Sequence, residues 1–156
     1  MLEIVEDLRQ EDVFHYELFV STRIHEFMGL PLPKQQIQSL LRLQYEAQTI
    51  AYECQFPQAK HELVYVGGIC IGRMITDIQS DSIHLVDISL FPQYRGNGYG
   101  TEVMKGLQNF SMERGLPITL QVFQGNPAQH LYERCGFYMT AELGPYIAMR
   151  WNPDYS

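Results

Sequence analysis

The chain has 156 residues, of which 46% are hydrophobic, which is enough for one compact domain but not for two. Its net charge of −7 argues against a general nucleic-acid-binding protein, because an acidic surface repels polyanions. No stretch approaches the roughly 20 apolar residues of a membrane span, and the start "MLEIVEDLRQED" is acidic where a signal peptide is basic. We therefore expect a single domain, residues 1–156, that is soluble, cytoplasmic and free of nucleic-acid or membrane partners.

The cysteines and histidines form no pattern of a disulfide framework or a metal site. Three cysteines include no CxxC pair, and their odd number leaves one thiol over, as is typical of a reducing cytoplasm. Four histidines lack the spacing of metal ligands, and we expect them at the surface or at helix caps: His15, His25, His61 and His130. The sequence predicts no bound metal.

The first 60 residues predict one strand and two helices. A short strand at "LEIV" precedes a helix whose apolar residues recur at steps of three and four: Val13, Tyr16, Val20, Ile24 and Phe27. Pro33 can occupy the first turn of a second helix, with its buried stripe at Ile37, Leu40, Leu41 and Tyr45. Residues 47–60 carry no clear period, and residues 45–60 could line a pocket or form only a helix end and a loop.

From His61 onward the apolar period changes to two. Strands over residues 61–66, 69–78 and 83–91, joined by short turns, predict an antiparallel meander. A helix marked by Val103, Leu107 and Phe110 should end at Gly115, and a strand at 117–123 should precede a short helix with Asn126 as its N-cap. Strands at 138–143 and 146–151 read as a final hairpin. The fold class is α/β: a mixed, mostly antiparallel sheet with one parallel strand–helix–strand unit, flanked by about four helices.

The stretch "PQYRGNGYGTE", residues 92–102, sets three glycines before a predicted helix. Such a helix N-terminus binds anions, because its unpaired amides converge and the helix dipole adds positive charge. It is not a Walker loop, since Thr101 and Glu102 follow Gly100 where a Lys-Ser/Thr pair is required. It is not a dinucleotide fingerprint either, since GxGxxG would need a glycine at position 101.

The pattern Arg95-x-x-Gly98-x-Gly100 resembles the acyl-CoA-binding loop of the GNAT superfamily of N-acetyltransferases. A second segment, "NPAQHLYERCGF", is similar to a later part of that superfamily, in register at Asn126, Ala128, Leu131, Tyr132, Gly136 and Phe137. The two segments together are far more specific than either alone. The resemblance covers roughly residues 60–150 and implies a GNAT-like acyl-CoA N-acyltransferase fold.

The resemblance also implies acetyl-CoA as the cosubstrate and assigns its contacts. Main-chain groups of the strand before the loop, at Ile88, Ser89 and Leu90, should bind the pantetheine arm as an added strand would. Lys105 and Arg95 can add positive charge near the diphosphate. The remaining predicted contacts are Gly96, Asn97, Gly98, Tyr99, Gly100, Thr101, Asn126 and Tyr132.

Acetyl transfer to an amine needs an oxyanion donor, a base and an acid for the departing thiolate. The resemblance assigns the acid to Tyr132 and the oxyanion donor to the Leu90 amide, with direct attack and no acyl-enzyme. For the base, His84 and Asp87 both stay open, and Asp87 could instead bind a cationic amine. The acceptor is a small molecule or a peptide or protein amine.

Two other functions remain open from the sequence alone. The chain could bind CoA without catalysis, as a sensor or partner-binding module, or it could bind a nucleotide. A homodimer is also possible, because the apolar strand "YIAMRW" could pair with a second copy, although a place inside the sheet would explain the same residues.

Overall fold

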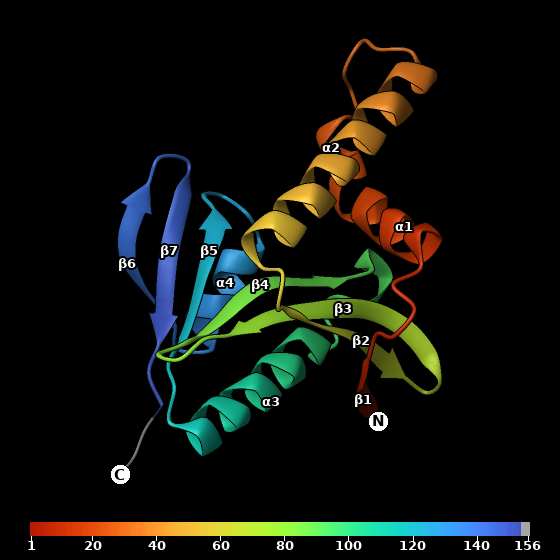
Figure 1. Ribbon diagram of the computed structural model, residues 1–156. Helices are drawn as coiled ribbons and strands as arrows, with labels where there is room; N and C mark the ends of the chain where they lie inside the picture. The colour runs from red at the N-terminus through yellow and green to blue at the C-terminus, as the bar shows by residue number, and fades with distance from the viewer. Residues whose placement is uncertain (154–156) are drawn as a thin grey trace.

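The described residues, 1–153 of the computed structural model, form one seven-stranded sheet with helices on both faces (Figure 1). The strands are β1 Leu2–Glu6, β2 Lys60–Val66, β3 Ile69–Ile78, β4 Ile83–Leu90, β5 Ile118–Phe123, β6 Tyr138–Leu143 and β7 Tyr146–Trp151. The helices are α1 Asp12–Arg23, α2 Lys34–Gln55, α3 Tyr99–Arg114 and α4 Ala128–Arg134, with 3-10 turns at Ile24–Glu26 and Pro92–Tyr94.

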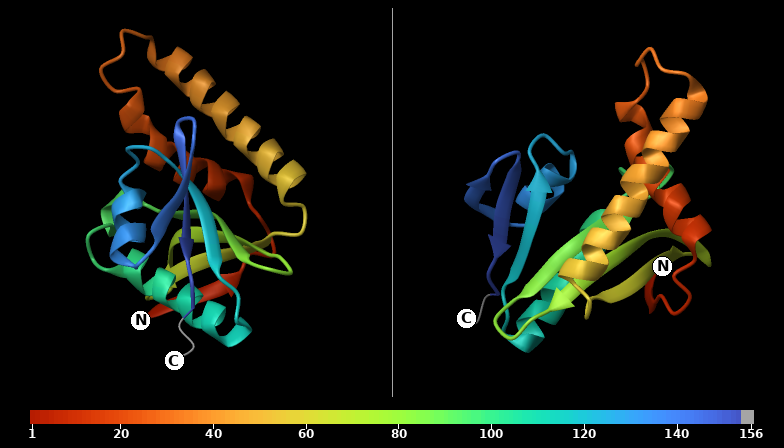
Figure 2. Two further views of the ribbon diagram at one scale, coloured as in Figure 1. Left: turned by 90° about the vertical axis from the view of Figure 1, so that its left-hand side faces the viewer. Right: turned by 45° about the horizontal axis from the view of Figure 1, so that its top comes forward.

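The strand order is β1-β2-β3-β4-β5-β7-β6, and every neighbouring pair is antiparallel except β4 and β5. This confirms the predicted mixed sheet with a single parallel strand–helix–strand unit, in which α3 is the crossover. Helices α3 and α4 bury their apolar side chains with one face of the sheet in the main core. Helices α1 and α2 cover the other face, and the loop between them projects beyond the sheet (Figure 2). None of the helices in residues 1–153 is long and apolar enough to cross a membrane.

The local turn signals of the sequence are confirmed. Gly67 and Gly68 both have positive φ in the turn between β2 and β3, and Gly115 ends α3 in the left-handed conformation at φ 66°. Only glycine adopts such angles without steric cost, so these turns are fixed locally. The strand predicted at residues 69–78 has the same bounds as β3.

The predicted N-terminal helix was too long, and its buried face was only partly correct: Phe27 is buried and Tyr16 and Val20 pack beside it, but Val13 and Ile24 are exposed. Helix α1 ends at Arg23 and continues only as a 3-10 turn, and Val13 is 69% exposed. The buried residues of α1 itself are His15, Leu18 and Phe19, of which Phe19 packs against Tyr45 of α2. Because α1 packs on both the sheet and α2, a single apolar stripe could not describe it.

Helix α2 extends through most of the segment that the sequence left unassigned. It runs for 22 residues to Gln55, with Leu41 and Tyr45 buried against α1 as predicted. Leu40, which the sequence placed in the same buried stripe, is 38% exposed. The weak apolar period after residue 47 reflects the residues that α2 turns toward the sheet, which are mostly polar or aromatic.

The last strand is not an edge. β7 pairs with β5 on one side and with β6 on the other, so "YIAMRW" lies inside the sheet and β6 forms the edge. Pairing within the chain thus accounts for the apolar residues of β7. A homodimer stays a prediction.

Gly72 allows β3 and β4 to approach each other closely. A Cβ atom at this position would overlap the carbonyl oxygen of Ser89 and lie 2.7 Å from Cδ2 of Leu90. We expect Gly72→Ala to lower the free energy of unfolding by about 3 kcal/mol, because overpacking forces the strands apart. Urea unfolding measures this. In the exposed helical control Gly106→Ala, no atom of residues 1–153 beyond the nearby helix backbone lies within 4 Å of the added Cβ, and a gain of about 0.5–1 kcal/mol is expected. Equal stabilities of the two variants would contradict the steric argument.

Candidate active site

β4 and β5 separate along half of their length and leave an opening in the sheet. Their parallel pairing ends at Leu85 and Leu120, and Figure 1 shows the two strands diverging beyond that point. The cause is a β-bulge: Ile75 of β3 pairs with Asp87, but its neighbour pairs with Leu85, which leaves Val86 as the extra residue. No sequence signal indicated this bulge.

The main chain of β4 faces this opening at alternate residues. The Phe91 N–H donates to the carbonyl of Ile71 at 2.9 Å and therefore faces β3. Because amides alternate between the two edges of a strand, the N–H groups of Ile88 and Leu90 face the opening, whereas those of Ser89 face β3. The predicted contact residues thus lie together, but only two of the three present main-chain groups to the opening.

The glycine loop lies between the end of β4 and the start of α3. Gly96 and Gly98 have φ of 78° and 81°, and no side chain among residues 1–153 caps the first turn of α3. Its amides are therefore free of side-chain acceptors, as an anion-binding turn requires. Gly100 serves packing: a Cβ there would lie 3.2 Å from Cδ2 of Leu131 in α4. The other loop residues, Arg95 and Asn97, are exposed, as is Lys105, while Tyr99 and Thr101 are half-buried.

That close contact brings α4, and with it Tyr132, beside the loop. Asn126 Oδ1 accepts a hydrogen bond from the Ala128 N–H at 2.9 Å, which supports the capping role predicted for it. Tyr132 is 7% exposed and packs against Phe137. Burial raises the pKa of the Tyr132 phenol, and its hydroxyl has no hydrogen-bond partner within residues 1–153. At neutral pH this phenol holds a proton that it can donate.

A buried polar cluster lies on the face of β4 that α1 and α2 cover. Arg73 Nε donates to Asp87 Oδ2 at 2.8 Å, and Arg73 Nη1 lies 3.2 Å from His15 Nδ1. The other ring nitrogen of His15 lies 2.7 Å from Asp7 Oδ2, and Ser89 donates to Asp87. Asp87 is therefore an ion-paired carboxylate held in one orientation.

The expectation that His15 is a surface or cap residue was wrong. It is 7% exposed and lies on α1 between Asp7, which follows β1, and Arg73 of β3. Burial lowers its pKa, and a neutral ring fits its contacts, since Nδ1 then accepts from Arg73 while the Nε2–H donates to Asp7.

The architecture has known counterparts. The profile of the acetyltransferase (GNAT) family matches residues 21–137 of the sequence. The chain belongs to this family. The resemblance seen in the two short segments is thereby confirmed, and the protein is an acetyltransferase of the family whose chemistry is acetyl transfer from acetyl-CoA to amines. No protein with curated annotation is significantly similar to it.

Several solved structures share this fold. The PaiA N-acetyltransferase of Thermoplasma acidophilum, in complex with coenzyme A, has a TM-score of 0.73 at 16% identity, covering 97% of this chain and 99% of that one. The ribosomal-protein-S18-alanine N-acetyltransferase of Escherichia coli has a TM-score of 0.66 at 18% identity, covering 100% and 96%. A putative streptothricin acetyltransferase of Bacillus anthracis, in complex with acetyl coenzyme A, has a TM-score of 0.56 at 18% identity, covering 63% and 65%.

The two candidate bases of this acetyltransferase lie apart. His84 lies at the closed end of the β4–β5 opening, where its Nδ1 is 2.9 Å from Thr119 Oγ1. Its ring stacks on that of Phe56, with 5.3 Å between the ring centroids. Burial lowers the pKa of His84, which leaves it neutral at pH 7. Asp87 lies beyond the bulge, and its negative charge helps to raise the pKa of Tyr132. The charge of Asp87 thus adds to the effect of burial on the phenol, whereas His84 is held by Thr119 and Phe56.

Sequence reasoning did not single out Tyr52 of α2. It lies in the segment that carried no assignment, and burial, together with the charge of Asp87, raises the pKa of its phenol. The signal that could have found Tyr52 is the helical spacing of Gln48, Tyr52 and Phe56, which a search for apolar residues overlooks.

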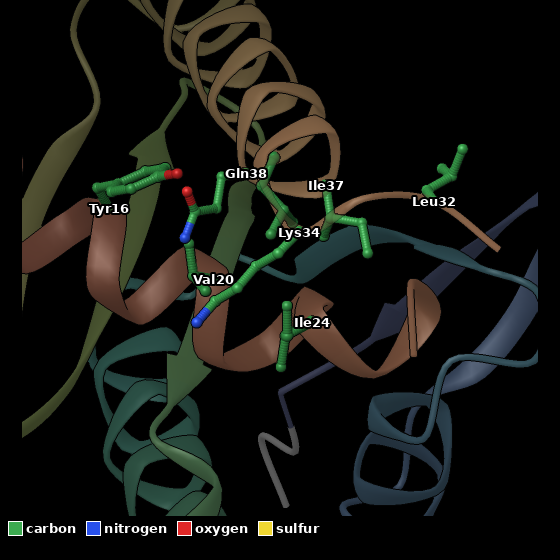
Figure 3. Close-up of a pocket in the computed structure, with 8 residues that line it drawn as sticks. Tyr16, Val20, Ile24, Leu32, Lys34, Ile37 and Gln38 are labelled. Atoms are coloured by element: carbon green, nitrogen blue, oxygen red, sulfur yellow. The ribbon is translucent and has the colours of Figure 1, made fainter. Parts of the chain in front are cut away.

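A separate cleft lies between α1 and the N-terminal half of α2. It has a volume of about 540 Å³ and is walled mainly by apolar side chains, with the Lys34 side chain reaching from α2 toward Val20 of α1 (Figure 3). It shares no residue with the β4–β5 opening. Within residues 1–153, no group of three or more His, Cys, Asp or Glu side chains could hold a metal ion.

Proposed function

We propose that this protein transfers the acetyl group of acetyl-CoA directly to an amine in the opening between β4 and β5. The observation that carries the proposal is a convergence: the unpaired edge of β4 ends at the glycine turn before α3, Gly100 of that turn lies against Leu131 of α4, and the neighbouring Tyr132 packs in the same core cluster as Leu90. A thioester cosubstrate with a diphosphate at its far end needs these three features together.

The residues fit the cosubstrate at both ends. The amides of residues 96–101 would hold the diphosphate, because no side chain caps that turn and the glycines leave no Cβ over it. The main-chain groups of Ile88 and Leu90 would bind the pantetheine amides along the free edge of β4. Ser89 supports them indirectly, since its hydroxyl holds Asp87.

Bound acetyl-CoA supplies the thioester carbonyl carbon that the amine attacks. The Leu90 N–H stabilises the negative charge that develops on the carbonyl oxygen. As the C–N bond forms and the C–S bond breaks, Tyr132 donates its proton to the sulfur. The acceptor enters as an ammonium ion and loses two protons in all. One of them restores the proton that Tyr132 gave to the sulfur, and the other is released to water.

Asp87 is the better supported group for handling the proton of the amine. It lies close enough to Tyr132 to affect its pKa, and it can accept a hydrogen bond from the ammonium ion while paired to Arg73. His84 is the second candidate, since its neutral ring can accept a proton, but it is held by Thr119 and stacked on Phe56.

The proposed acceptor is the amine of a small molecule or of a protein. The three cysteines, Cys54, Cys70 and Cys135, are all unpaired thiols, which supports the cytoplasm as the location of the enzyme.

The test is the release of free thiol from acetyl-CoA in the presence of a panel of primary amines. We expect acetylated amine and free CoA in equal amounts, and stabilisation of the protein against heat by CoA. Binding of CoA without thiol release for any amine would support the non-catalytic alternative. Stabilisation by ATP or NAD but not by CoA would contradict both.

A further inference from the structure

The guanidinium of Arg73 is held by residues of three other elements. Its Nε donates to Asp87 Oδ2 of β4 at 2.8 Å, its Nη1 lies 3.2 Å from His15 Nδ1 of α1, and its Nη2 donates to Gln48 Oε1 of α2 at 3.2 Å. A guanidinium is planar, so contacts at its three nitrogen atoms fix the plane of the group as well as its position.

The contact with Arg73 also fixes the His15 ring. A guanidinium only donates hydrogen bonds, so Nδ1 of His15 is the acceptor, and the proton of the neutral ring lies on Nε2. That N–H donates to Asp7 Oδ2 at 2.7 Å, just beyond β1. The Asp7 carboxylate therefore keeps the ring in the tautomer and orientation that the contact with Arg73 requires.

The Asp87 carboxylate takes its direction from these contacts. Its Oδ2 accepts from Arg73, and the Ser89 hydroxyl lies 3.0 and 3.1 Å from its two oxygen atoms. Along β4, Asp87 follows the bulged residue Val86 and lies two positions after Leu85, where the pairing with β5 ends. The carboxylate thus belongs to the part of β4 where the opening starts, and its orientation depends on the plane of the guanidinium.

We propose that His15 and Gln48 are positioning residues for the reaction, and that both act through Arg73 to hold the Asp87 carboxylate in the direction of the acceptor amine. The inference rests on the proposed acetyl transfer, in which Asp87 handles the proton of the amine. Helices α1 and α2, which cover this face of the sheet (Figure 2), thereby set the geometry of a group on β4. A misplacement of about 1 Å can cost on the order of a hundredfold in rate, so contacts far from the reacting atoms can control it.

Two substitutions at position 15 remove one contact each. In His15→Gln, the side-chain amide reaches the position of Nε2 and keeps the hydrogen bond to Asp7, but Nη1 of Arg73 loses its acceptor. In His15→Asn, the amide oxygen takes the position of Nδ1 and keeps the acceptor for Arg73. Steady-state kinetics are measured with acetyl-CoA and the most rapidly acetylated amine of the panel.

We expect kcat to fall about ten- to a hundredfold in His15→Gln but less than about threefold in His15→Asn. The KM for acetyl-CoA should stay unchanged in both variants, because the proposed contacts of that cosubstrate are main-chain groups of β4 and of the glycine turn. A purely structural role of His15 would not make kcat depend on which of the two contacts is kept.

A substitution on α2 tests the same inference independently of His15. Gln48→Met removes the acceptor of Arg73 Nη2 at nearly constant volume, and kcat should fall about tenfold. Gln44→Met, one turn earlier at an exposed position of α2, is the matched control and should behave as the wild type. Heat denaturation of each variant separates a change in rate from unfolding. If a His15 variant does not fold, Gln48→Met decides the outcome.

A double variant shows whether His15 acts through Arg73. The ammonium group of Arg73→Lys keeps a positive charge beside Asp87, but it lacks the fork that reaches His15 and Gln48 at the same time. Adding His15→Gln to Arg73→Lys should therefore lower kcat no further.

The outcomes distinguish this inference from the proposed function. Equal kcat values in His15→Gln and His15→Asn, wild-type kcat in Gln48→Met, or a full further loss in the double variant would overturn the inference and leave acetyl transfer standing. Wild-type kcat in Asp87→Asn would also overturn it, since the positioned group would then have no part in the reaction. Absence of thiol release by the wild type with every amine would overturn the proposed function itself.

Discussion

Replacing Tyr132 by phenylalanine is expected to lower kcat about ten- to a thousandfold, because the leaving sulfur then lacks its proton donor. The affinity for CoA should hardly change, since the phenol ring and its packing against Phe137 remain. Burial raises the pKa of Tyr132, so the wild-type residue stays a proton donor over the whole neutral range.

The structure makes this substitution a clean test. The Tyr132 hydroxyl has no hydrogen-bond partner within residues 1–153, so its removal should leave the melting temperature near that of the wild type. Tyr138→Phe is a matched control, because that hydroxyl accepts from Asn152 at the exposed edge of the sheet. A Tyr132→Phe enzyme with wild-type turnover would remove the phenol from the mechanism.

Replacing Arg73 by methionine should lower the free energy of unfolding by about 3–5 kcal/mol. The guanidinium contacts Asp87, His15 and Gln48, and its side chain is only 11% exposed. Its loss leaves the Asp87 carboxylate nearly buried without its counterion, and this uncompensated charge accounts for most of the expected cost. Urea unfolding at pH 7 provides the measurement.

A second substitution separates charge from packing. In the double variant Arg73→Met with Asp87→Asn, the remaining group is neutral, and we expect part of the lost stability to return. If the single variant were as stable as the wild type, the cluster would be too solvated to matter. If the double variant were no more stable than the single one, lost packing and not charge would dominate.

The sequence alone predicted most of the architecture because the relevant signals are local. Alternation of apolar residues gave the bounds of β3, and glycines that must adopt positive φ marked the turn at Gly67 and the end of α3 at Gly115. The family could be inferred for the same reason, since its two recognisable segments are short and continuous. Their glycines, and Tyr132 beside them, are spaced within a turn or a helix and need no knowledge of distant contacts.

The parts of the site that sequence reasoning could not supply all depend on residues far apart in the chain. The bulge at Val86 exists only in the pairing of β4 with β3, and the burial of His15 depends on Arg73, 58 positions away. Gln48 contacts Arg73 only because α2 lies over this face of the sheet.

The sequence therefore determined the order of the elements, the glycine turn and the phenol, because each is set by a period of a few residues. The tertiary structure decided where β4 opens, which carboxylate lies near that phenol and which charges remain uncompensated. Burial and pairing between distant segments set these properties, and a linear pattern does not record which side chains will share one buried volume.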